Sequence, residues 1–174
     1  MQMLGVFVVK SAFPANGFSL IELMACLAIL AILASMTAPA WQAMVARTQL
    51  EVARDDLMND VQTARVQALQ SSTDLQMTRL QGCAWASANS NDWSCGWQLQ
   101  RQDTHEVLRT HAIHAPLQLL MAANAKELWV GARGELGSVG TRWNLRSLNA
   151  ATQQYVVCLN SASRLRWQPG ATCG

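Results

Sequence analysis

The carboxylate of Glu22 lies at the start of a long uncharged stretch, which makes its chemistry unusual. Residues 17–24 read Gly-Phe-Ser-Leu-Ile-Glu-Leu-Met, and no charged side chain occurs in the 24 residues from Leu23 to Ala46. A helix of this length spans about 36 Å at ~1.5 Å per residue, enough to cross a hydrocarbon core of ~30 Å. Because a carboxylate inside a bilayer costs at least ~2.5 kcal/mol, we expect Glu22 to have a functional partner.

Two simpler interpretations of this segment stay open. A secretory signal also combines a charged start with an apolar core, but that core usually spans only about 7–15 residues and is removed. In a plain single-pass anchor, Glu22 lies at the membrane interface, where the dipole of a helix N-terminus stabilises a negative charge without any partner. The length of the uncharged run favours a retained membrane helix over a secretory signal.

Residue patterns typical of enzymes and metal centres are missing from the sequence. It contains no Gly-x-Ser-x-Gly elbow, no phosphate-binding Gly-x-x-x-x-Gly-Lys loop and no recognisable pair of catalytic carboxylates. His105, His111 and His114 have neither a Cys-x-x-Cys knuckle nor a His-Glu-x-x-His helix beside them. We therefore expect no enzyme activity, no cofactor and no metal, and interpret the histidines as ordinary strand residues.

Positive charge gathers toward the end of the sequence. From Leu136 to Gly174 there is no Asp or Glu, and the charged residues are Arg142, Arg146, Arg164 and Arg166. Arg164 and Arg166 are two residues apart, so on a strand they project from one face, and Trp167 adjoins them. The planar guanidinium suits phosphate, which indicates a patch for nucleic-acid backbone without base specificity, with double-stranded DNA as the expected partner. A solvated face or a subunit contact explains the same residues equally well.

The protein has seven tryptophans, and three of them, Trp85, Trp93 and Trp97, lie close together in the sequence. They could form a platform on which a ligand stacks. Tryptophans in a small domain more often fill its core, so we favour packing over ligand binding.

Helical spacing continues after the uncharged run, but with charged residues interspersed. Apolar residues recur at steps of seven, four, three and four, which places them on one helix face; they are Leu50, Leu57, Val61, Ala64 and Ala68. We predict an amphipathic stem over residues 47–70 that buries this stripe against a sheet.

Beyond the stem, short segments alternate between apolar and polar residues, and glycines separate them as turns do. The predicted strands are residues 75–80, 97–101, 107–113, 127–130, 143–148, 155–159 and 164–167. Their number and spacing indicate an antiparallel, β-rich head over residues 71–174.

Residues Gly17 to Leu23 resemble the class III signal of type IV pilins and of the pseudopilins of type II secretion. The resemblance implies that a prepilin peptidase removes a leader, residues 1–17, by cutting after Gly17. Phe18 then becomes an N-methylated terminus, and Glu22 pairs with an N-terminal amine during filament assembly. Pro39 falls where many pilins break their helix, as expected from the missing N–H of proline.

The head is similar to the family of minor pilins and pseudopilins that includes GspH and FimT. The segments that carry this similarity are the glycine-rich stretch 131–140, Asn144-Leu-Arg, and the sequence from Tyr155 to Trp167. This resemblance implies a type IV pilin-like α+β fold, with a long N-terminal transmembrane and amphipathic helix packed on a small antiparallel β-rich head. The expected division is a cleaved leader (1–17), a transmembrane helix (18–46), the stem (47–70) and the head (71–174).

The family also implies a location and partners. The chain is expected to cross the bacterial inner membrane once, with its head in the periplasm, and to join other pilins or pseudopilins in a filament. FimT-like pilins of transformable bacteria carry a DNA-binding Gly-Arg-x-Arg motif, where this chain has Ser163-Arg164-Leu165-Arg166. Two functions follow: a FimT-like pilin that binds DNA for uptake, or a GspH-like pseudopilin of type II protein secretion with no DNA role.

Five cysteines divide between the apolar segment and the head. Cys26 lies in the apolar run, where a free thiol behaves as a small apolar side chain. In the oxidising periplasm the other four are expected to form disulfides. We favour pairing between neighbours, Cys83 with Cys95 and Cys158 with Cys173, although four cysteines allow three connectivities.

Overall fold

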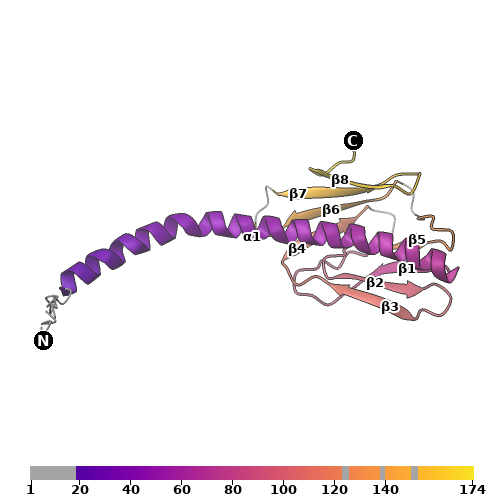
Figure 1. Cartoon of the computed structure of the whole chain (residues 1–174), viewed down its shortest axis with the longest axis horizontal. Helices are drawn as coiled ribbons and strands as arrows, with labels where there is room; N and C mark the ends of the chain where they lie inside the picture. Colours follow the sequence, from indigo (N-terminus) through magenta and orange to yellow (C-terminus); the bar gives the residue numbers. More distant parts are fainter. Residues whose placement is uncertain (1–18, 123–125, 138–139, 150–152) are drawn as a thin grey trace, which may run out of the picture. The chain divides into compact units, whose positions relative to one another are not determined.

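The computed structural model describes residues 19–122, 126–137, 140–149 and 153–174. One long helix, α1 (Leu20–Ser71), is followed by eight strands (Figure 1). By its contacts the chain forms two compact units, Met1–Pro39 and Ala40–Gly174.

Helix α1 is 52 residues long and contains a stretch that is long and apolar enough to cross a membrane. Pro39 lies inside α1, and the helix continues through it. The expectation that the helix breaks at this residue is therefore wrong. A proline removes one backbone hydrogen bond, and the helix formers on either side continue the helix past it. At the other end Ser72 takes a left-handed φ of 51°, and the Thr73 N–H donates to the Ala68 C=O, which caps the helix.

Burial along α1 begins abruptly. The described side chains from Leu20 to Val45 are exposed, whereas Ala46 is only 3% exposed. The five predicted stripe residues, Leu50, Leu57, Val61, Ala64 and Ala68, are all 0% exposed. The amphipathic stem predicted from their spacing is therefore confirmed, and we call these five residues the stem stripe.

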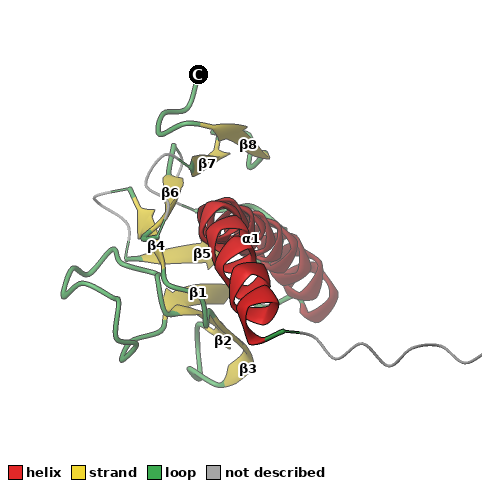
Figure 2. Cartoon of the chain, turned by 90° about the vertical axis from the view of Figure 1, so that its left-hand side faces the viewer, coloured by secondary structure: helices red, strands yellow, loops and turns green. Residues whose placement is uncertain are grey.

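Two antiparallel sheets of four strands bury the stem stripe. The first has the order β3-β2-β1-β5, and its strands are β1 (Leu75–Arg79), β2 (Gly96–Arg101), β3 (Val107–Ala112) and β5 (Glu127–Val130). The second has the order β4-β6-β7-β8, and its strands are β4 (Leu117–Met121), β6 (Arg142–Ser147), β7 (Gln154–Leu159) and β8 (Leu165–Pro169). The stem runs along one side of both sheets (Figure 2).

Seven of the eight strands were predicted to within about two residues at each end, and β4 was missed. Its sequence, Leu-Gln-Leu-Leu-Met, consists of good helix formers and has no β-branched or aromatic residue. In the structure Leu117, Leu119 and Met121 face the core and pair with β6, so tertiary burial outweighs their local preference.

The stem is joined to the first sheet by a buried carboxylate as well as by apolar packing. Asp60 is 6% exposed, and its Oδ2 accepts a hydrogen bond of 2.9 Å from the indole N–H of Trp97. Its Oδ1 lies 3.2 Å from Nη2 of Arg109, and His111 stacks on Trp97 with 4.5 Å between ring centres. Asp60 thus connects α1 to both β2 and β3.

This arrangement predicts that Asp60→Ala destabilises the protein strongly. The substitution leaves the buried Trp97 N–H and the Arg109 guanidinium without their acceptor, which should lower the free energy of unfolding by about 2–4 kcal/mol. Urea unfolding of the detergent-solubilised chain, followed by tryptophan fluorescence, measures this change. The control Glu106→Ala removes an exposed carboxylate from the head, whose side chain has no partner among the described residues, and should cost less than ~1 kcal/mol. Equal effects of the two substitutions would contradict the role given to Asp60.

Candidate functional site

The residues expected at the processing site lie mostly outside the described part of the chain. Gly17 and Phe18 are not among the described residues. Glu22 is in the first turn of α1, where its backbone N–H donates to the C=O of Ser19, and its side chain is exposed. The neighbouring Leu20 and Ile21 are also more than 70% exposed. This end of the helix therefore offers an apolar surface that carries a single carboxylate.

The four cysteines of the head form two disulfides in the structure. Cys83 is bonded to Cys95, and Cys158 is bonded to Cys173, which are the neighbour pairs favoured from the sequence. Cys26 is an exposed free thiol on α1. Because Cys158 lies on β7, its bond holds the segment that follows β8 against this strand.

The loop closed by the first disulfide is organised around Asp92, which is 1% exposed. Burial disfavours its charge, but hydrogen bonds from Ser87 and Ser94 outweigh that effect and lower the pKa of the carboxyl. Next to it, Trp93 is fully buried against Trp143 in an edge-to-face contact with 6.1 Å between ring centres. Trp93 therefore belongs to the core rather than to a ligand platform.

Three of the four predicted arginines lie on the side of the second sheet that faces away from α1. In register, Arg142 of β6 pairs with Cys158 of β7, which pairs with Arg166 of β8, so the two arginines flank the disulfide in one row. Arg146 lies further along β6, and the residues between the arginines on this strand alternate with them in exposure. We call this surface, together with Arg164 in the adjoining turn, the basic face.

The basic face carries no compensating negative side chain. All four arginines are exposed, and none of them forms an ion pair with a side chain that the structure describes. The sequence from Leu136 onward contains no Asp or Glu. The surface is thus suited to an anionic ligand, since a cluster of one sign of charge attracts the opposite sign.

The turn before β8 holds Arg164 in place. The Arg164 backbone N–H donates to Oδ1 of Asn160 (2.9 Å), and the Asn160 N–H donates to the Arg164 C=O (3.1 Å). Ser163 takes a left-handed φ of 56°, a conformation usual for glycine. It is fixed there by two bonds, one from the Leu136 N–H to its Oγ and one from Arg65 to its C=O. The serine thus adopts the kind of backbone that a glycine at this position favours.

Trp167 does not join the basic face, contrary to the expectation from its neighbours in sequence. It projects toward α1, where the guanidinium of Arg54 lies 3.9 Å from its ring centre and Tyr155 meets it edge to face. On the same side, Glu51 accepts hydrogen bonds from Arg47 and from the Tyr155 hydroxyl. These two bonds lower the pKa of the Glu51 carboxyl. Together the contacts fasten the stem to the second sheet.

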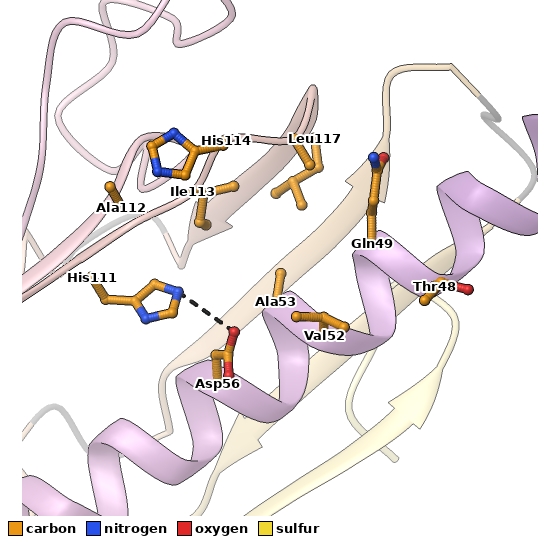
Figure 3. A pocket seen from close by; sticks show the side chains of 11 residues that line it. Thr48, Gln49, Val52, Ala53, Asp56, His111, Ala112, Ile113, His114 and Leu117 are labelled. Atoms are coloured by element: carbon orange, nitrogen blue, oxygen red, sulfur yellow. Dashed lines mark ion pairs between the residues drawn. The ribbon is translucent and has the colours of Figure 1, made fainter.

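A small apolar pocket of about 270 Å³ lies between the stem and the segment that links β3 to β4 (Figure 3). Val52 and Ile113 line it, and at one end His111 lies 3.6 Å from Asp56. The histidines differ in role: His111 bridges helix and sheet, His114 lines the pocket and His105 is in a turn, so only His111 is a strand residue. The described residues contain no group of His, Cys, Asp and Glu able to hold a metal ion.

Comparison with protein families gives two matches. Residues 14–38 match the prokaryotic N-terminal methylation motif, which covers the segment around Gly17, Phe18 and Glu22. Residues 53–163 match the model of the type II transport protein GspH, which covers most of the stem and head. No curated protein matches the chain in sequence.

Solved structures with the same fold include subunits of two filament systems. The type IV minor pilin FimU of Pseudomonas aeruginosa superposes with a TM-score of 0.59 at 21% identity, covering 72% of this chain and 94% of FimU. The minor pseudopilin EpsH of the Vibrio cholerae type 2 secretion system gives a TM-score of 0.52 at 12% identity, covering 70% of this chain and 97% of EpsH. At such low identity the likeness shows the type IV pilin-like fold, as predicted from the sequence.

The backbone of Ser163 leads to a prediction about stability. Ser163→Gly relieves the cost of a left-handed residue but loses the bond to Leu136, so its net effect should stay within ~1 kcal/mol. Ser163→Val loses the same bond and adds a β-branched side chain to this conformation, so it should destabilise the protein by about 2 kcal/mol or more. Thermal unfolding measures both, with Ser161→Val in the same turn as the control. If Ser163→Gly and Ser163→Val cost the same, the backbone conformation is not what distinguishes them.

Proposed function

This chain belongs to the family of the type II transport protein GspH, and from that premise we propose that it is a FimT-like minor pilin that binds DNA through its basic face. Members of this family are structural subunits that assemble with other pilins or pseudopilins. The observation that supports a DNA role is the row of Arg142 and Arg166, extended by Arg146 and Arg164, on a sheet whose strands contain no Asp or Glu.

Arginines in this arrangement suit the phosphates of double-stranded DNA. Arg142 and Arg166 are separated by one strand, hence by roughly 10 Å at ~4.8 Å per strand spacing. Duplex DNA carries one charge per ~1.7 Å of its axis, so a flat surface of this size meets several phosphates at once. Contacts of this kind position a protein on DNA without reading its sequence. The proposed binding is therefore weak and indifferent to base sequence.

We propose that the N-terminal part of the chain anchors and assembles the subunit. In this proposal a prepilin peptidase removes residues 1–17, the amine of Phe18 is methylated, and the Glu22 carboxylate pairs with an N-terminal amine in the filament. The match to the methylation motif and the exposed apolar surface around Glu22 support it.

The proposed membrane boundary follows from the residues at the end of the uncharged run. Trp41 is 69% exposed, and tryptophan is enriched at the membrane interface. Arg47 is the first charged residue after Glu22, and burial in the head begins at Ala46. We therefore assign residues 18–46 to the inner membrane, residues 47–70 to the stem and residues 71–174 to a periplasmic head. The two disulfides suit that compartment, because it is oxidising.

A second function is a GspH-like pseudopilin of type II protein secretion without a DNA role. The family model that matches and the fold shared with EpsH favour it. In that case the basic face contacts another subunit of the filament or an exported protein. The two functions differ in whether the chain binds DNA, which a binding measurement on the purified chain distinguishes.

Processing can be checked by mass spectrometry of the protein extracted from membranes that contain an active prepilin peptidase. We expect a chain that starts at Phe18 and carries one added methyl group. Glu22→Ala should leave insertion and cleavage intact but reduce incorporation into filaments, because only assembly uses the charge. Glu106→Ala, an exposed glutamate of the head, serves as the control. Finding only uncleaved chain, or normal incorporation of Glu22→Ala, argues against the proposed N-terminal roles.

The DNA role predicts weak, salt-dependent binding by the detergent-solubilised chain. The dissociation constant for duplex DNA should be about 10⁻⁴ to 10⁻⁶ M at physiological salt, with no sequence preference. Each phosphate contact contributes about 0.9 to the slope of log affinity against log salt, so Arg164→Ala with Arg166→Ala should reduce the slope by about two. Fluorescence anisotropy over a salt series measures it.

A matched control removes two exposed positive charges from the segments just before and after β5, Lys126→Ala with Arg133→Ala, and so gives the same net charge. If this control and the Arg164/Arg166 variant weaken binding equally, the effect is one of net charge and not of the basic face. If the unaltered chain does not bind DNA, the secretion function is favoured.

A further inference from the structure

A hollow of about 350 Å³ opens on the outer side of the second sheet, within the basic face. Its floor consists of one row across three strands, in which Arg146 of β6 lies between Gln118 of β4 and Gln154 of β7. Asn144, two residues before Arg146, adds a third amide side chain. We call this site the amide hollow.

The wall of the amide hollow is formed by the segment that follows β8. Gly170 and Ala171 line the hollow, and the disulfide between Cys158 and Cys173 ties this segment to β7. Val156 lies on the same outer side of β7, between Asn144 of β6 and Gln168 of β8, and it is fully buried there. The hollow is therefore a built feature, with a covalently held wall beside a paired sheet.

The chemistry of the lining is mixed. Leu120 supplies an apolar surface, while three amides and one guanidinium supply donors and acceptors. The amide oxygen of Asn144 is buried and has no hydrogen-bond partner among the described residues. A buried acceptor without a partner is unfavourable, so rotation of the Asn144 amide toward an N–H group bound in the hollow recovers a hydrogen bond.

We propose that the amide hollow binds one unpaired base of a single-stranded nucleic acid, while the arginines around it hold the adjoining phosphates. The ligand must be anionic outside the hollow, because the charged side chains on the strands around it are Arg142, Arg146 and Arg166. It must present a flat, partly apolar group with N–H donors inside it, which a nucleobase does. The volume is near the lower end for ligand pockets and so fits a single ring system rather than a larger group.

This inference rests on the proposed DNA role but adds a distinction to it. Duplex DNA presents its bases only within the grooves, so it contacts the arginines and leaves the hollow unused. A single strand, or a frayed duplex end, can turn a base outward and place it in a pocket. The chain should therefore bind single-stranded DNA more tightly than it binds a duplex of the same length at the same salt concentration.

The test uses the detergent-solubilised full chain and three labelled 12-nucleotide probes in anisotropy titrations. The probes are a single strand with bases, a duplex, and a single strand of abasic sugar-phosphate. We expect the strand with bases to bind about tenfold more tightly than the abasic strand. Asn144→Leu should remove that tenfold difference and leave duplex binding unchanged, because it alters only the hollow.

Two variants separate the hollow from the basic face. Asn149→Leu makes the same substitution outside the hollow and should behave as the unaltered chain. Arg164→Ala with Arg166→Ala should weaken all three probes together. If base-containing and abasic strands bind equally to the unaltered chain, the hollow does not bind a base, even where the duplex binds and the DNA role stands.

Other outcomes also decide the matter. If none of the three probes binds, the DNA role and the base site fail together. If polyglutamate of similar length competes as well as the single strand does, the occupant is an acidic protein segment, and the base site is overturned. The abasic comparison needs no variant, so the result does not depend on whether Asn144→Leu folds.

Discussion

The stem stripe has to be covered by two separate sheets at once, and the arrangement of the head follows from that requirement. Three buried residues on this side of the helix, Ala53, Ala64 and Ala68, have small side chains. Apolar contact alone is not directional. Polar contacts on either side of the stripe therefore fix the helix, with Asp60 bonded to the first sheet and Glu51 and Arg54 to the second.

The same requirement explains where the positive charge lies. Side chains on a strand alternate between its two faces, so each strand of the second sheet divides into residues for the core and residues for the outside. On β6, Trp143 and Leu145 face the core, so Arg142 and Arg146 face outward. On β8, Trp167 packs against Arg54 of the helix, so Arg166 faces outward. The basic face is thus the part of the sheet that the helix does not use.

How much of this the sequence predicts depends on how far apart the interacting residues are. Helical and strand spacing are local, so the stem stripe and seven strands were predicted from them. The burial of Asp60 was not, because its partner Trp97 is 37 residues away and nothing near Asp60 in the sequence indicates a buried acceptor. The charged residues of the stem all lie off its apolar stripe, and only the tertiary structure separates Asp60 and Arg54, which are buried, from Asp55, which is exposed.

Ser163 illustrates a different limit. This residue is a serine where the Gly-Arg-x-Arg motif has glycine, yet the structure places it in the left-handed region that glycine favours. Bonds from Leu136 and Arg65 hold it there, and both residues are far away in sequence. The residue type at a position therefore predicts its backbone conformation only when contacts with residues far away in the sequence do not determine that conformation.

Fold and function separate in this protein for a physical reason. The fold needs the stem stripe and the inward faces of the two sheets, and the relation to FimU and EpsH at 21% and 12% identity is a relation of that fold. The outward faces contribute little to stability, so their side chains can differ between a pilus and a secretion filament without changing the architecture. Any difference in what the two kinds of subunit bind therefore lies in the outward residues. In this chain those residues are arginines and amides around a hollow with a disulfide-held wall, and the proposed DNA and base sites rest on them.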